Sequence, residues 1–283
     1  MAVSRRMTVP GGFASALRRH RTLLLPALLL CGSLAAWAAA TEPWSGAPEP
    51  PQVETPSYEY DGRFTFVRIR FRPLDWGFGE YSWGLDLKWN HDYPQAEKNF
   101  SRIVEEITGI DVQQGTGNVL EIDDPRLFDY PWAYMCEPGF WSPTDEQVEI
   151  LRQYLLRGGF LVIDDFFDQP GRSAQWSNFR HQIERVFPGV ILYPMQVDHP
   201  IFRTFFELDD LDFSVPEMGD WFPPAIYGVF EDNDPQKRLL AIVNYNMDVG
   251  DYWEWSDTAF YPAHMTQKGF KLGINYLAYG LLY

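Results

Sequence analysis

The chain has 283 residues and a formal net charge of −16, from 39 acidic and 23 basic residues. Five of the basic residues lie within positions 1–40, which hold no acidic residue, so positions 41–283 carry 18 basic and 39 acidic residues and a net charge of −21. Such a charge repels phosphate backbones and anionic lipid surfaces. We therefore expect no nucleic-acid partner, and membrane contact only through the N-terminal segment.

Residues 1–40 have the pattern of an export signal. Five arginines precede an uncharged apolar run from Leu23 to Ala40, which closes on three alanines. This order predicts a secretory signal peptide. The run has 18 residues and barely reaches the roughly 20 that span a bilayer, so an uncleaved membrane anchor is the alternative. In both cases the basic flank stays in the cytoplasm, and we expect the remainder in the periplasm or cell envelope.

A Pro-rich linker, residues 41–57, separates this segment from one folded domain, residues 58–283. Of the two cysteines, Cys31 lies in the apolar run. Removal of the signal would therefore leave Cys136 without a disulfide partner in the chain.

Strands and helices alternate along the folded domain. The apolar patterns predict strands at 64–71, 118–122, 132–136, 158–165 and 190–195. Helices are predicted between them, from Asp92 to Gly109, from Ser142 to Gly158, and ahead of Pro188. Two antiparallel-looking strands, 226–230 and 239–245, and a last helix, 270–282, complete the pattern. Near-continuous apolar strands that alternate with helices are typical of a parallel sheet covered on both faces.

Six short motifs follow one another in this domain. They are YPQAEKNF at 93–100, LFDYP at 127–131, EPG at 137–139, YLLRGGFL at 154–161 with DDF at 164–166, DHPIF at 198–202, and NMDVGDYWEW at 246–255. In this order they resemble the signatures of the bacterial domain of unknown function 4159, over a stretch from about Phe64 to the C-terminus. The resemblance implies a fold similar to class I glutamine amidotransferases and trehalose-utilisation-type proteins, and it implies no reaction.

The pattern and the resemblance together predict the fold class. We expect a three-layer α/β/α domain with a mainly parallel, flavodoxin-like sheet and antiparallel additions near the C-terminus. In open sheets of this kind, ligands bind at the carboxyl ends of the strands. The strand that ends in Asp164 and Asp165 is therefore where we look first for function.

Three residues are catalytic candidates. Asp164 and Asp165 could act as catalytic carboxylates, metal ligands or sugar hydrogen-bonding groups, or could hold the following loop. His199 follows Asp198 and could be a general base, although DHPI is also a structural turn in this fold class. Amidotransferases carry a cysteine where this chain has Asp164-Asp165, so glutamine amidotransferase activity is not expected.

No cofactor is expected, and the metal signals are weak. Asn244, Asn246 and Asp248 place oxygen atoms at alternate positions, as a calcium loop does, but the glycine and the glutamate of an EF-hand are out of place. The histidines are scattered, and none has a zinc-ligand spacing to Cys136. Asx turns are the alternative use of the two asparagines.

Ligand-binding candidates come from segments that should meet at the carboxyl edge. Aromatic side chains could stack on sugars or anchor a partner, or could only cover the sheet ends. The acidic side chains suit a polar pocket wall. The candidates are Trp76, Glu137, Asp168, Asp251, Trp253 and Glu254, together with the Asp198-His199 turn.

Two functions are open at this point. The first is a non-catalytic binding or scaffold domain for an envelope protein or a glycan, with its site at the carboxyl edge. The alternative is a hydrolase-like enzyme acting on a glycan or another small substrate through Asp164 or Asp165, with His199 or a bound cation. The absence of nucleophile and metal motifs favours binding.

Overall fold

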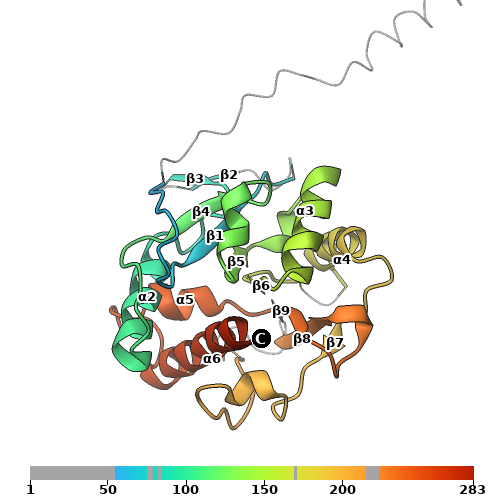
Figure 1. Cartoon of the computed structure of the whole chain (residues 1–283). Helices are drawn as coiled ribbons and strands as arrows, with labels where there is room; N and C mark the ends of the chain where they lie inside the picture. The colour runs from blue at the N-terminus through green and yellow to red at the C-terminus, as the bar shows by residue number, and fades with distance from the viewer. Residues whose placement is uncertain (1–54, 75–78, 82–83, 169–170, 215–222) are drawn as a thin grey trace, which may run out of the picture. The chain divides into compact units, whose positions relative to one another are not determined.

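The computed structural model describes residues 55–74, 79–81, 84–168, 171–214 and 223–283. They belong to one unit, Gln52–Tyr283 (Figure 1). The predicted export segment and most of the linker lie outside the described residues. Within the described part of the chain, no helix has both the length and the apolar character that crossing a bilayer requires.

A seven-stranded sheet organises the domain, in the order β4-β1-β5-β6-β9-β8-β7. The parallel strands are β4 (Asn118–Glu121), β1 (Val67–Arg70), β5 (Trp132–Cys136), β6 (Phe160–Asp164) and β9 (Leu239–Tyr245). β8 (Ala225–Phe230) runs antiparallel to β9, and the short β7 (Tyr193–Pro194) runs antiparallel to β8. The mainly parallel sheet with antiparallel additions near the C-terminus is as predicted. The strand expected at 239–245 is antiparallel only to β8, because it pairs parallel with β6 and so belongs to the parallel core.

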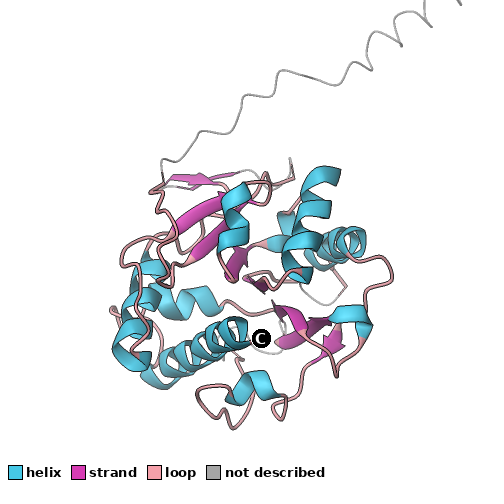
Figure 2. Cartoon of the chain, viewed as in Figure 1, coloured by secondary structure: helices cyan, strands magenta, loops and turns pink. Residues whose placement is uncertain are grey.

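Helices cover both faces of this sheet (Figures 1 and 2). On one face lie α2 (Gln95–Thr108), α5 (Val249–Glu254) and α6 (Ala263–Leu282), and on the other lie α3 (Asp145–Leu156) and α4 (Ala174–Val186). Side chains of one strand alternate between two cores, because successive residues point to opposite faces. In β5, Trp132 and Tyr134 pack with α2 and α6, whereas Ala133 and Met135 pack with α3 and α4.

The helix boundaries have local causes. Thr144 begins α3 with a capping box, in which its side chain accepts a hydrogen bond from the backbone N–H of Gln147. The cap is therefore Thr144 and not Ser142, where the predicted helix began. Gly109 ends α2 in the left-handed region, with φ of 71°.

Three features differ from the sequence-based prediction. The strand expected at 190–195 shrinks to two residues, because the chain leaves the sheet after Pro194. The helix α5 was not predicted, since its six residues are too few for a periodic pattern. A small hairpin of β2 (Gly79–Tyr81) and β3 (Gly84–Asp86) lies in a stretch for which no strand or helix was predicted.

Candidate functional site

The carboxyl edge of the sheet gathers many acidic side chains. Cys136 and Asp164 are paired last residues of β5 and β6, so Glu137 and Asp165 leave the sheet side by side. The segment after β9 returns to the same place, because Asp165 N donates to the carbonyl of Met247 at 3.1 Å. Chain topology therefore brings three loops together at this edge.

The loop before α2 supplies the remaining residues. Arg68, buried in the middle of β1, donates to the carbonyls of Trp89 and His91 at 3.1 and 2.9 Å. Its guanidinium also forms an ion pair with Glu97 of α2, and both side chains are inaccessible to solvent. The guanidinium of Arg68, a residue of the sheet, thus fixes the backbone segment that carries His91.

His91 is the centre of one cluster of charges. Its Nδ1 lies 3.3 Å from Glu137 Oε1 and 3.4 Å from Asp165 Oδ2, and its Nε2 lies 3.0 Å from Asp86 Oδ1. Asp86 also pairs with Lys88 at 2.6 Å. A ring nitrogen of His91, the sulfur of Cys136 and a carboxylate oxygen of Asp165 lie within 4.8 Å of one another.

The electrostatics of this cluster favour a protonated imidazole. Burial alone would lower the pKa of His91, but the carboxylates of Asp165, Glu137 and Asp86 raise it to about 9. Burial, and then the charge of Asp165, raises the pKa of Glu137 to about 8. Burial and the same carboxylate also raise the pKa of the Cys136 thiol, which disfavours a nucleophilic thiolate.

A second group of carboxylates adjoins the first. Oxygen atoms of Asp92, Asp165 and Asp248 lie within 4.8 Å of one another, and so do those of Asp92, Asp251 and Glu254. Loss of solvation and the charge of Asp165 raise the pKa values of Asp92 and Asp248. Burial, and then the charge of Asp251, raises the pKa of Glu254 to about 7. We call these five carboxylates and the His91 cluster together the acidic edge.

Several residues at or beside the acidic edge have a left-handed backbone conformation, which residues other than glycine rarely adopt. Lys88, Asp92, Glu137, Asp165 and Asn246 have φ between 51 and 65°. Only three other non-glycine residues in the described ranges have positive φ. Residues in the left-handed region are concentrated at functional sites, where the surroundings hold them in place.

Comparison with known proteins adds one finding. The family model described as "Domain of unknown function (DUF4159)" matches residues 77–281. The chain belongs to this family. Every residue of the acidic edge lies within the matched range. A search of curated proteins finds no match to the chain.

Asp164, a catalytic candidate of the sequence, has a structural role in this family member. It is fully buried and accepts four hydrogen bonds at 2.8–3.0 Å, from Tyr134 Oη, Asn244 Nδ2 and the backbone N–H groups of Val249 and Gly250. Its carboxylate holds the first turn of α5 to the end of β6. Of the two aspartates, only Asp165 faces the acidic edge.

His199, the other catalytic candidate, lies at the opposite edge of the sheet. Its ring packs against Phe230 and Tyr279, and Tyr279 Oη accepts a hydrogen bond from the N–H of Leu239, the first residue of β9. The expected convergence of His199 with the carboxylates is therefore wrong. The cause is the early end of β7, after which the chain turns back. His199 Nδ1 instead caps the following helical turn by accepting from Ile201 N.

Three further candidates hold loops. Asp168 accepts from the N–H groups of Gln175 and Trp176 and so caps α4. Asn244 binds the Asp164 carboxylate, and Asn246 accepts from Asp168 N at 2.9 Å. The two asparagines are thus structural, but they bond to distant residues and do not form the expected Asx turns. Asp248 caps α5 through Asp251 N at 2.8 Å and also belongs to the acidic edge.

The tryptophan candidates do not form an exposed stacking surface in the described residues. Trp253 is fully buried, and its Nε1 donates to the carbonyl of Gly269, so it cannot stack on a ligand. Trp76 lies outside the described residues. The exposed aromatics beside the acidic edge are Trp255 and Phe260, and Trp255 Nε1 donates to Asp251.

Sequence reasoning missed His91 and Asp92. Both lie in a loop without a periodic pattern, and the ion pair that positions the loop joins Arg68 to a residue 29 positions away. The one available signal was their place directly before the YPQAEKNF motif.

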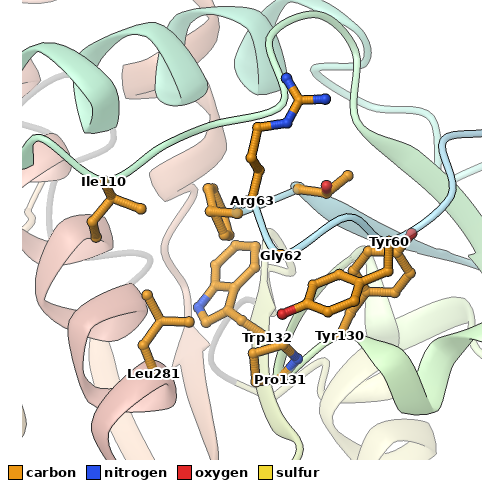
Figure 3. A pocket seen from close by; sticks show the side chains of 10 residues that line it. Tyr60, Gly62, Arg63, Ile110, Tyr130, Pro131, Trp132 and Leu281 are labelled. Carbon is orange, nitrogen blue, oxygen red and sulfur yellow. The ribbon is translucent and has the colours of Figure 1, made fainter.

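A small pocket of about 90 Å³ lies at the amino edge of the sheet, where β5 begins with Trp132 (Figure 3). Tyr60, Arg63, Trp132 and Leu281 are among its lining residues. It contains no acidic side chain and is separate from the acidic edge.

Proposed function

We propose that this protein is an exported envelope protein whose folded domain binds a ligand with a positively charged group at the acidic edge. The observation that carries the proposal is the excess of carboxylates there. Seven carboxyl groups gather there: Asp86, Glu137 and the five of the second group. The cations near them in the described part of the chain are fewer, namely Lys88, His91 and the buried guanidinium of Arg68. Carboxylates held close together repel one another and destabilise the fold. A bound cation would offset this repulsion.

The surroundings support the same chemistry. Trp255 and Phe260 present exposed rings beside Asp251, and Tyr261 Oη donates to the same carboxylate at 2.6 Å. Aromatic faces attract cations through their quadrupole, and the attraction is strongest for tryptophan. Carboxylates next to exposed rings suit the amino group of an envelope glycan or of a protein partner.

A pair of sugars tests this proposal. We expect glucosamine to raise the melting temperature of the full-length chain, by about 3 °C at ten times its dissociation constant, and N-acetylglucosamine to leave it unchanged. Acetylation removes the charge and keeps the ring. The measurement is thermal unfolding followed by fluorescence.

Three variants test whether glucosamine stabilises the protein by binding at the acidic edge. Glu254→Gln and Asp251→Asn should each abolish the stabilisation, whereas Glu149→Gln, on the helix α3, should retain it. Equal shifts by both sugars, no shift by glucosamine, or a full shift in Glu254→Gln would contradict the proposal.

A second candidate function is hydrolase-like catalysis on a glycan or other small substrate. The observation that favours it is His91 Nδ1 within 3.4 Å of both Asp165 and Glu137. An imidazole beside two carboxylates can transfer protons to and from a substrate, and His91 here takes the place that sequence reasoning gave to His199.

A further inference from the structure

We propose that His91, Cys136 and Asp165 form a binding site for a zinc-class divalent metal ion. The inference deepens the proposed function, on which it rests, because it names one cation that the acidic edge accepts. Nitrogen, sulfur and carboxylate oxygen donors together suit zinc and cobalt, whereas calcium and magnesium require oxygen donors.

The distances between donor atoms support a tetrahedral site. With metal bonds of about 2.0 Å to nitrogen and oxygen and about 2.3 Å to sulfur, a tetrahedral angle places N and O about 3.3 Å apart and S and O about 3.5 Å apart. In the structure, His91 Nδ1 lies 3.4 Å from Asp165 Oδ2, and Cys136 Sγ lies 3.3 Å from the same oxygen. Both of these donor pairs are therefore near the spacing that the ion would impose, and a His91 ring nitrogen lies within 4.8 Å of Cys136 Sγ.

The outer groups around His91 also match a metal site. A metal-bound histidine usually donates its second ring N–H to a carboxylate, which fixes the ring and its tautomer. Here Nε2 lies 3.0 Å from Asp86 Oδ1, and Lys88 holds Asp86 at 2.6 Å. This arrangement leaves Nδ1, the atom that lies 3.4 Å from Asp165 Oδ2, as the donor to the ion.

The charges of the donor groups also suit a divalent ion. Binding breaks the S–H bond of Cys136 and the Nδ1–H bond of the protonated His91 and releases both protons to solvent. It forms one metal–sulfur and one metal–nitrogen bond, with no change in oxidation state. A thiolate, a carboxylate and a neutral imidazole balance the two charges of the ion. Three protein donors leave a fourth position open, and Glu137 Oε1, 3.3 Å from His91 Nδ1, is placed to accept a hydrogen bond from water there.

Cobalt(II) is the probe of choice, because zinc has a filled d shell and gives no visible spectrum. The experiment uses the full-length chain in detergent, without a histidine tag and freed of metal by a chelator. We expect one cobalt ion per chain, visible bands of a tetrahedral site and a near-ultraviolet thiolate-to-cobalt band. Zinc should displace the cobalt.

Each ligand has a matched control. Cys136→Ser should abolish the thiolate band and weaken binding at least tenfold, and Cys31→Ser should change neither. His91→Gln should weaken binding to the same extent, and His181→Gln, on the exposed side of α4, should leave it unchanged. Asp86→Asn should weaken binding about 10–100-fold while keeping the thiolate band, since it acts through His91.

No stoichiometric cobalt, or a thiolate band that survives Cys136→Ser, would overturn the inference. Binding of magnesium or calcium but not cobalt would also overturn it, and would assign the ion to the carboxylates of the second group. These outcomes are distinguishable from failure of the proposed function, because the sugar measurement is made without added metal and depends on Asp251 and Glu254.

Discussion

Replacing Glu97 with Gln should lower the free energy of unfolding by about 3–5 kcal/mol, because it leaves the buried guanidinium of Arg68 without a counter-charge. Both side chains of this pair are inaccessible to solvent. Gln cannot accept a charged hydrogen bond of the same strength, and water cannot replace it in the core. Urea denaturation followed by circular dichroism measures the loss.

The double variant Arg68→Met/Glu97→Leu separates the ion pair from its role in positioning the loop. Two apolar residues avoid the unpaired charge, so most of the lost stability should return. The carbonyls of Trp89 and His91 would still lack their donor, and ligand binding at the acidic edge should remain weak. A fully stable Glu97→Gln variant would show that the pair does not support the fold.

Replacing Asp164 with Ala should cost about 3–5 kcal/mol of the free energy of unfolding, since four buried donors lose their acceptor at once. The amide protons of Val249 and Gly250 should exchange faster with solvent, because they would have no partner. Asp164→Asn keeps the shape and part of the bonding, so its loss should be smaller. Urea denaturation and hydrogen exchange give the two measurements.

Asp209→Ala is the matched control, because Asp209 is exposed. It should leave the midpoint of unfolding unchanged. If Asp164→Ala instead kept full stability and lost ligand binding, Asp164 would belong to the functional site, as its position at the strand end suggested from the sequence alone.

Much of the fold could be predicted because its signals are local. The apolar run that ends in Asp164, the apolar run of β9 and the glycine after α2 are each visible within a few residues. The two-residue β7 and the six-residue α5 are too short for such signals. Their place depends on tertiary contacts, such as the bonds from Asp164 to the first turn of α5.

The site was predictable only in part. Strand topology gives the edge at which Glu137 and Asp165 meet, because both follow parallel strands. It cannot tell which of Asp164 and Asp165 faces the acidic edge. It also cannot place His91, whose loop depends on Arg68 in the core, or exclude His199, whose position follows from where β7 ends.

The central claim is that the carboxylates of the acidic edge bind a cation, and that their repulsion lowers the free energy of unfolding when no cation is bound. Glu254 contributes to that cost. Its pKa of about 7, raised by burial and by Asp251, means that ionisation of Glu254 removes stability as the pH rises from about 5 towards 8. The residue is partly exposed, so solvent screening limits the effect to about 1 kcal/mol.

The most direct measurement is the urea unfolding of Glu254→Gln and of the wild-type chain at about pH 5 and pH 8, with a chelator and no ligand. The account predicts equal stability at pH 5 and a variant that is more stable than the wild type at pH 8, by up to about 1 kcal/mol. A variant less stable than the wild type at both values would contradict it, because Glu254 would then stabilise the fold.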